Sequence, residues 1–409
     1  MPAVTGLRGT GDWGPDERPK NFREMILWLN PNGDAPLQAL MSKMRKESTD
    51  DPEFSWWEET NVVWRGAINN GAGYTATDTT LTIDTADALE LKKGDLLLVE
   101  TAEDTAYSAE IMEIASDPTS STSITVTRGV AGSTAAALPD NTFLTKIGNA
   151  NEEGSRAPTA TSRNPTKQFN YTEIQKDSYS ITGTAEVTKA RTGDPVKNDK
   201  KRKMFDHFAA LEFTSIFGKR FETTGANGKP KRYSGGLMYF LADAATNRGI
   251  TSAMQIWGAA ATEDTFIDAI APMFDYRTDD GNVDTRIVLC GNGFLTNLNK
   301  LVRNSASTRI QYDGKIDFYG LSLRQFTIPQ GTLYLKTHPL FNQHGRYTNS
   351  ALFINPSAIR WRYMNGRDTK FKDNVQLPDE DARRGYWLTE GGIEVNYART
   401  MQYQGNFQI

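Results

Sequence analysis

The chain has few of the residues that enzymes and metalloproteins most often use for chemistry. Its 409 residues include one cysteine, Cys290, and three histidines. A single cysteine excludes a disulfide framework and suits a reducing compartment. Because Cys290 lies in the apolar run TRIVLC, we expect it to be buried as a small hydrophobic residue. His338 and His344 are separated by five residues, a spacing that argues against a metal site. His207 is predicted to be a packed or capping side chain.

Long hydrophobic runs and an excess of positive charge are also missing. The longest apolar run is Met25 to Leu29, whereas a membrane span needs about 18 residues. The N-terminal residues contain no apolar signal core, so a soluble cytoplasmic product that contacts no membrane is expected. The net charge is -4, and there is therefore no global basic field to hold nucleic acid. Any contact with DNA is expected to be local and weak.

Motifs that signal catalysis or cofactor binding are absent from the sequence. The Gly-rich segment Arg128 to Ala137 lacks the Lys-Ser/Thr of a P-loop and is predicted to be a hairpin tip. The aspartates of Asp279 to Asp284 do not follow the spacing of a calcium loop, and a turn explains them better. A Cys-His nucleophile pair has no positive support. We therefore predict no catalytic residue, no cofactor and no metal ligand, and we consider catalysis the weaker hypothesis.

The patterns that are present divide the chain into five parts. Residues 1–65 read as an N-terminal arm, with Gly, Pro and charge up to residue 20 and two short helical patterns, NFREMILWL and PLQALMSKM. Residues 66–148 contain short alternating runs separated by turn residues, which predict a small antiparallel β-module: TLTID, GDLLLVE, SAEIMEI, TSITVT and NTFLTKI.

The third part, residues 149–232, is predicted to contain a polar loop, a strand and the longest helix of the chain. The strand is FNYTEIQKDSYSITG, and the helix begins at Val196. The first third of the helix is basic. The apolar residues of the remainder are predicted to be buried: Met204, Phe205, Phe208, Leu211, Phe213, Ile216, Phe217 and Phe221.

The last two parts complete an α+β plan with an inserted β-module. Residues 233–337 alternate helical patterns with strands, among them the buried strand TRIVLC. Residues 338–409 are rich in strands with mixed polar and aromatic alternation, which suits a half-exposed sheet.

In this order the parts resemble the major capsid proteins of tailed bacteriophages. The segments that carry the resemblance are PLQALMSK, FSWWEE, ALEFTSIFGKR and GGLMYFL. The resemblance implies an N-arm (1–65), an extended loop or E-loop with an inserted β-module (66–148), a loop return limb and spine helix (149–232), an A-domain (233–337) and a P-domain sheet (338–409). It also implies a structural protein without enzymatic activity.

The same resemblance implies a function and a set of partners. Copies of the chain would form hexamers and pentamers of an icosahedral head shell around double-stranded DNA. Portal, scaffold and decoration proteins are implied partners, assembly would occur in the host cytoplasm, and the product would be the virion. Two alternatives stay open: a carbohydrate-binding or adhesin-like virion protein, and a cellular nanocompartment shell of the same fold.

Intersubunit contacts are predicted from aromatics and from charge. Tryptophan is enriched among interface hot spots, and Trp56, Trp57 and Trp64 lie in the arm, although at least one of them is expected to fill the subunit's own core. Residues 78–117 carry eleven acidic and two basic residues, and residues 156–232 carry sixteen basic and eight acidic ones. Complementary patches of this kind steer encounter and fix register. The charged candidates are Asp84, Asp87, Glu90, Glu100, Glu103, Asp104, Arg156, Arg163, Lys167, Lys200, Lys201, Arg202 and Lys203.

Overall fold

The computed structural model describes residues 45–60, 63–84, 87–100, 108–189, 192–276, 284–304, 311–318, 321–343 and 345–409. Within residues 302–323 it describes the backbone only. The chain divides into two compact units, one formed by Trp57–Lys167 and the other by Met1–Trp56 with Gln168–Ile409. We call the first the barrel unit and the second the main unit. The five predicted domain boundaries remain predictions.

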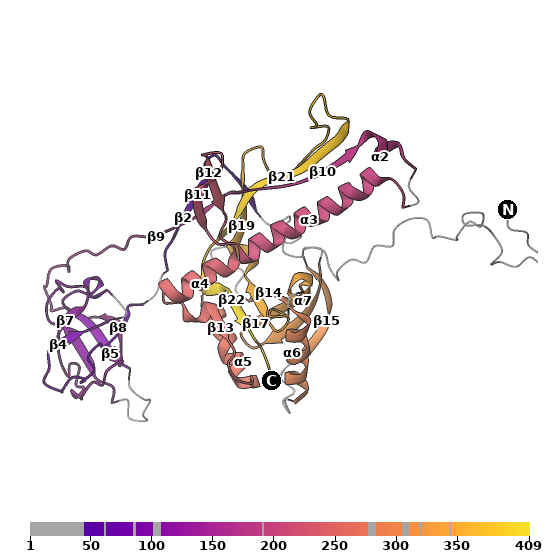
Figure 1. The fold of residues 1–409 in the computed structure, drawn as a ribbon. Coiled ribbons are helices and arrows are strands. Elements are labelled where there is room, and N and C mark those ends of the chain that lie inside the picture. The colour runs from indigo at the N-terminus through magenta and orange to yellow at the C-terminus, as the bar shows by residue number, and fades with distance from the viewer. Residues whose placement is uncertain are drawn as a thin grey trace, which may run out of the picture. The chain divides into compact units, whose positions relative to one another are not determined.

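The barrel unit contains a six-stranded antiparallel sheet, which lies in the indigo to purple part of the chain in Figure 1. Its strands, in spatial order, are β3 (Arg65–Ala67), β8 (Phe143–Asn149), β5 (Asp95–Val99), β6 (Ile111–Ile114), β7 (Ser123–Thr127) and β4 (Thr80–Thr82). An isolated bridge between Ile68 and Ile83 joins the ends of the first and last strands. The short helix η1 (Ala88–Glu90) follows β4. The predicted strands of the β-module are confirmed.

Alternation along these strands places one side of each in the barrel core. Leu97 and Val99 of β5 and Ile124 and Val126 of β7 are almost completely buried. A one-residue shift of register would turn these side chains outward, so the hydrophobic pattern fixes the pairing. The remaining core residues are Trp64, Ile68, Leu81, Ile83, Ala88, Leu91, Met112, Ile114, Leu138 and Leu144.

The main unit has a seven-stranded mixed sheet with apolar clusters on both faces. Its strands, in spatial order, are β13 (Met254–Ile256), β22 (Gln402–Gly405), β18 (Ala351–Ile354), β14 (Thr285–Cys290), β17 (Gly331–Thr337), β16 (Leu321–Ile328) and β15 (Gln311–Phe318). In β14, Ile287 and Leu289 join one cluster, whereas Val288 and Cys290 join the other. Cys290 is buried as predicted.

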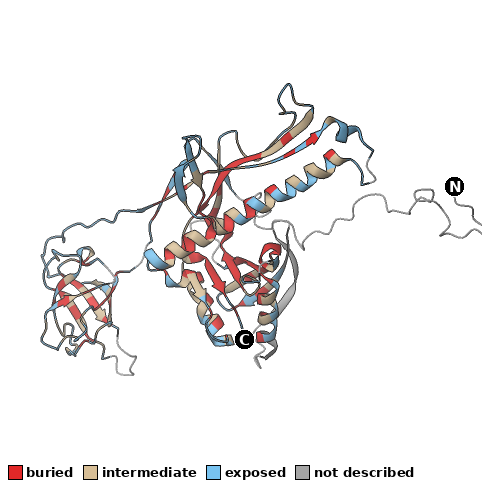
Figure 2. Cartoon of the chain, in the orientation of Figure 1, coloured by how far each residue is buried: buried red, intermediate tan, exposed pale blue. Residues whose placement is uncertain are grey.

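Helices cover the two faces of this sheet. The first cluster includes side chains of α3 (Pro195–Phe217) and α4 (Leu237–Asn247). The second cluster includes side chains of α5 (Glu263–Ile270) and α6 (Asn292–Asn304). Figure 2 shows the buried strands in red between these helices. Strand β14, predicted to be buried, therefore packs against helices through both faces, which explains its continuous apolar sequence.

A second sheet of five strands packs beside α3. Its order is β1 (Lys46–Thr49), β19 (Ile359–Met364), β21 (Ala382–Val395) and β10 (Glu173–Thr182), and β20 (Lys370–Lys372) also pairs with β21. The strands after residue 338 are thus divided between the two sheets of the main unit. The smaller elements are β2 (Glu53–Glu58), β9 (Thr166–Tyr171), β11 (Phe221–Thr224), β12 (Pro230–Tyr233), α2 (Gly183–Val187), α7 (Pro339–Gln343) and η2 to η5 (Thr251–Ala253, Ala271–Phe274, Pro356–Ala358 and Ala398–Thr400).

The predicted long helix is confirmed as α3, with 23 residues. The Asp194 side chain caps its first turn by accepting hydrogen bonds from the backbone N–H groups of Val196 and Lys197 at 2.9 and 3.2 Å. The helix ends before Gly218, and not at Phe221 as the apolar pattern suggested. A Cβ at Gly218 would lie 2.4 Å from the Ser234 carbonyl oxygen, so this turn needs glycine.

The predicted burial along α3 is wrong for part of the helix. Met204, Phe205 and Phe213 are 39%, 41% and 40% exposed, and Phe221 after the helix is 61% exposed. The buried residues of α3 form a narrow stripe that includes Leu211 and Ile216. A helix that packs on one side only can bury one stripe, and its other aromatic residues face outward.

Several predictions fall on residues outside the described ranges. These are the helical patterns of residues 21–44, most of the acidic turn at residues 279–284, and His344. Among the helices of the described residues, none is long and apolar enough to cross a membrane.

Candidate functional site

The aromatic strand β2 separates the three tryptophan candidates by alternation. Phe54 and Trp56 point into the main-unit core, where the Trp56 ring lies 5.7 Å from the Phe240 ring. Trp57, on the opposite side of the strand, is 64% exposed. Trp64 lies in the barrel core, and its Nε1–H donates to the Asp87 carbonyl oxygen at 3.0 Å. At least one tryptophan was expected to fill the subunit's own core, and two do so. An intersubunit role remains a prediction, and its best candidate is now Trp57.

Some of the acidic candidates of the barrel unit form ion pairs with basic residues of the same unit. Arg163 lies 2.5 Å from Glu90, and Arg65 donates to both Glu100 oxygens at 2.7 and 2.5 Å. Hydrogen bonding to Arg65 lowers the pKa of Glu100 to about 2. Sequence reasoning placed Arg163 and Glu90 in opposite patches, whereas the structure pairs them within one chain.

The other acidic candidates differ in their surroundings. Asp87 accepts a hydrogen bond from the Leu89 N–H at 2.9 Å and so caps η1. Asp84 is exposed at the end of β4. Glu103 and Asp104 lie outside the described residues. Asp84 and Asp87 are therefore exposed, and neither takes part in an ion pair among the described residues.

The basic candidates on α3 also have local acidic partners. Lys200 lies 2.7 Å from Asp373, and Lys203 lies 3.1 Å from Asp206. Arg202 lies 3.6 Å from Asp199, one turn earlier on the same helix. The Lys203–Asp206 and Arg202–Asp199 pairs are exposed, and such pairs contribute about 0–1 kcal/mol each and leave the side chains able to exchange partners. Lys201, Arg156 and Lys167 are exposed. Among the ion pairs of the described residues, the one that joins a basic candidate to an acidic candidate is Arg163–Glu90.

Sequence reasoning missed the residue that organises the start of α3. Asp373 accepts hydrogen bonds from Lys200 at 2.7 Å, from the Tyr179 hydroxyl at 2.5 Å and from Arg383 at 3.0 Å. Burial alone would raise the pKa of Asp373, but these donors outweigh it and lower the pKa well below its usual range. The partners lie up to 194 positions apart, so no local signal could have revealed the cluster.

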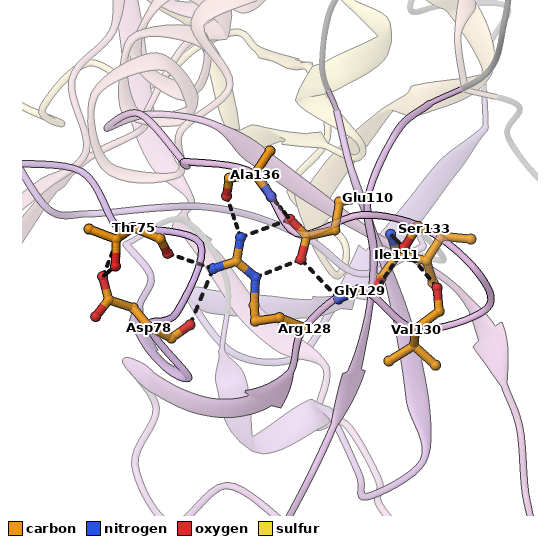
Figure 3. Close-up of polar contacts among 9 residues, drawn as sticks. All are labelled: Thr75, Asp78, Glu110, Ile111, Arg128, Gly129, Val130, Ser133 and Ala136. Carbon is orange, nitrogen blue, oxygen red and sulfur yellow. Dashed lines mark hydrogen bonds and ion pairs between the residues drawn. The ribbon is translucent and has the colours of Figure 1, made fainter.

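A second missed feature is a buried ion pair at one end of the barrel (Figure 3). Glu110 and Arg128 are almost fully buried and are joined by two hydrogen bonds of 2.6 and 2.7 Å. The remaining Arg128 donors reach the carbonyl oxygens of Thr75, Asp78 and Ala136. The segment predicted as a hairpin tip is therefore held at its first residue by this pair.

Two buried histidines anchor α3 to its neighbours. His207 contacts Asp177 at 2.7 Å through Nδ1 and Thr389 at 2.8 Å through Nε2. His338 contacts Glu212 of α3 at 2.8 Å, and both side chains are fully buried. His207 is packed, as predicted. Within the described ranges, no group of three or more His, Cys, Asp or Glu side chains is arranged to hold a metal ion.

The polar clusters of the described residues thus join helices and strands of the same chain. Aromatic and charged side chains are exposed on its surface. Residues 3–402 match the profile of the SU10 major capsid protein family. The chain belongs to this family. It is therefore a capsid protein: copies of it form the shell of a phage particle, and its place is the virion.

The chain is also similar to individual known proteins. A major capsid protein of Pseudomonas phage PaMx41 is 27% identical over 387 residues, which cover 94% of this chain and 87% of the relative. Among solved structures, a chain of the cyanophage A-1(L) capsid matches with a TM-score of 0.47 and 9% identity over 97% of this chain and 99% of that one. A SrpI encapsulin of Synechococcus elongatus matches with a TM-score of 0.40 and 8% identity over 60% and 76%. The assignment rests on the family match, which favours the capsid over the adhesin and nanocompartment alternatives.

Proposed function

We propose that this capsid protein forms a closed icosahedral head shell from hexamers and pentamers, around double-stranded DNA, by binding energy alone and without catalytic turnover. The observation that carries this proposal is the family match over residues 3–402. Scaffold, portal and decoration proteins are the proposed partners, and assembly takes place in the host cytoplasm. With a net charge of -4, the chain contacts the packaged DNA weakly and locally.

Exposed apolar side chains on rigid elements support a role in self-association. Trp57 on β2 and Phe205 and Phe213 on α3 are each at least 40% exposed. Aromatic residues of this kind are enriched at protein interfaces and supply much of their binding energy. We assign Trp57 and the outer face of α3 to contacts between copies of the chain. Lys201 and Arg202, near the start of the same face, would add complementary charge.

Electron microscopy of the expressed protein, with and without its candidate scaffold protein, tests the proposal. Closed shells of uniform size are the expected result, because the protein would need no chemical turnover to assemble. A protein that stays monomeric at high concentration and with the scaffold present would contradict it. Genome neighbours such as a portal or terminase gene would further separate a phage shell from a cellular compartment.

A further inference from the structure

The β11–β12 hairpin of the main unit is formed without a core of its own. Every residue of β11 is exposed, as are the turn residues Ala226–Gly228 and the first two residues of β12. Phe221 is 61% exposed. Figure 2 shows the hairpin largely in the colour of exposed residues. A two-stranded hairpin in water is marginally stable at best, so a hairpin with both faces exposed is suited to being covered by a partner.

Contacts within the hairpin fix its shape but bury little apolar surface. Phe221 and Tyr233 are paired across the strands with ring centroids 6.5 Å apart, and Arg232 lies 3.4 Å from Glu222. At the turn, Gly228 has a φ of 72° and the Gly225 N–H donates to the Lys229 carbonyl oxygen at 2.7 Å. The hairpin therefore has a defined conformation and presents a defined surface.

That surface is basic. Residues 219–233 contain five basic residues and one acidic residue, and the acidic residue is paired with Arg232. Arg220 is directed inward, where it packs on the Phe169 ring at 3.8 Å and donates to the Phe169 carbonyl oxygen at 2.7 Å. Lys229 and Lys231 are exposed, and no ion pair of theirs occurs among the described residues. The hairpin base also borders a pocket of 440 Å³ lined by Glu173, Phe221 and Tyr233 among others.

The same chain carries a surface of opposite charge. Residues 57–167, the barrel unit, contain sixteen acidic and eight basic residues, a net charge of -8. Four of the acidic residues are paired within the unit by four of the basic ones, which leaves the excess unchanged. An acidic surface of this kind can bind a basic partner through its side chains. Asp84 and Asp87 are exposed beside η1.

We propose that the β11–β12 hairpin of one copy binds the acidic barrel surface around Asp84 and Asp87 of a second copy. This contact rests on the proposed shell, in which every copy would meet several others. Lys219, Lys229 and Lys231 are the exposed basic residues of this segment, and three charges are too few to hold DNA, whose binding rests on many phosphate contacts. An exposed Phe221 beside those lysines suits a protein surface better, because phosphates offer an aromatic ring no apolar contact.

Cysteine cross-linking tests the contact directly, because the only native cysteine is buried. Full-length chains with Ala226→Cys are mixed with longer, tagged full-length chains carrying Leu89→Cys, assembled, and treated with a short bismaleimide. The matched control carries Thr134→Cys in place of Leu89→Cys. Thr134 lies on the loop that follows the end of β7, whereas Leu89 lies on η1, beside the start of β7, so the two cysteines sit at different ends of that strand. The Leu89→Cys mixture should give roughly tenfold more mixed dimer than the control, because a docked pair has a high effective concentration.

A charge-reversal series keeps the test falsifiable if labelling fails. Lys229→Glu with Lys231→Glu should lower the mixed dimer about tenfold and slow assembly, and Asp84→Lys with Asp87→Lys in the same chain should restore part of both. Native chains that never form shells, even with the candidate scaffold protein present, would overturn the proposed function. Native shells with no mixed dimer above the control would overturn the docking contact alone. Reversed chains that assemble normally but retain less DNA would also overturn it, and would make the hairpin a nucleic-acid contact.

Discussion

At the scale of single residues, Glu110 and Arg128 form the most deeply buried ion pair among the described ion pairs of the barrel unit. All five guanidinium donors of Arg128 have acceptors, and Glu110 also accepts from the N–H groups of Gly129 and Ala136 at 3.2 and 3.1 Å. Removing one member of such a pair leaves a buried charge without compensation, at a cost of about 3–5 kcal/mol. We expect Arg128→Met to destabilise the barrel by this amount. Hydrogen exchange of peptides from β6 and β7, measured by mass spectrometry, reports the change locally.

The exposed Arg65–Glu100 pair provides the control. Its side chains are 50% and 34% exposed, so Arg65→Met should cost below about 1 kcal/mol. The double variant Glu110→Leu with Arg128→Met should recover part of the loss, because it removes both buried charges. Equal effects of Arg65→Met and Arg128→Met would show that burial of the pair contributes nothing.

The carboxylates of the barrel also predict a dependence on pH. Hydrogen bonding to Arg65 lowers the pKa of Glu100 from 4.5 to about 2. Burial would raise the pKa of Glu110, but its bonds to Arg128 and two backbone N–H groups lower it. These two carboxylates bind protons less tightly in the folded state than in the unfolded state. Their contribution to the stability of the barrel is therefore present above pH 4.5 and is lost as the pH falls towards 2. Barrel melting temperatures should drop across this window.

The Glu100→Gln variant separates the contribution of this residue. At pH 7 it should be slightly less stable than the native chain, by less than about 1 kcal/mol because the pair is partly exposed. Below pH 3 the difference should shrink, since the native carboxylate is then losing its charge. A difference that stays constant from pH 7 to pH 2 would refute the linkage. Melting curves followed by circular dichroism at several pH values supply the measurement.

At the scale of elements, α3 has two faces with different expected roles. Leu211 is buried in the main-unit core, whereas Phe205 and Phe213 are about 40% exposed on the outer face. Phe205→Gln with Phe213→Gln should leave the free energy of unfolding of the isolated subunit within about 1 kcal/mol, because glutamine is a good helix former. The same variant should assemble poorly, as measured by light scattering and electron microscopy.

Leu211→Ala is the matched control on the same helix. It should cost about 2–5 kcal/mol of subunit stability, because it opens a cavity in the core. If the double glutamine variant assembles as well as the native chain, the outer face of α3 is solvent-exposed in the shell and plays no part in contacts. If it fails to fold, the exposed phenylalanines belong to the subunit core after all.

Local patterns predicted elements well and partners poorly. The alternating runs of the β-module became strands because period-two alternation buries one face of a sheet, but the Ile68–Ile83 bridge that closes the barrel depends on pairing order, which no run encodes. The presence of the long helix α3 followed from its composition, whereas its C-terminal end and its exposed aromatics did not, because burial depends on what packs beside a helix. Asp373 and Lys200 are 173 positions apart, and only the fold brings them together.

At the scale of the whole molecule, the chain is a nearly neutral protein with strongly unequal parts. Its net charge is -4, of which the barrel unit contributes -8, so the rest of the chain carries +4. In chain order the barrel begins with β3 and ends with β8, and these two strands are paired neighbours with Gly66 opposite Leu144. Paired strands lie about 4.8 Å apart. A short Gly-Ser linker can therefore replace residues 66–144, and we expect the main unit to fold without them.

This barrel-deleted chain isolates the role of charge in assembly. The Debye length falls from about 10 Å at 0.1 M salt to about 3 Å at 1 M, so attraction between exposed patches weakens as salt rises. Assembly of the native chain should slow with salt, because the acidic barrel and the basic main unit of different copies attract one another. The barrel-deleted chain should assemble more slowly at low salt and should show little salt dependence. Light scattering from 0.1 to 1 M salt measures both, and circular dichroism confirms that the deleted chain is folded. Equal salt slopes for the two chains would mean that the barrel's charge is only a solvated surface, and that self-association rests on the exposed aromatics of β2 and α3.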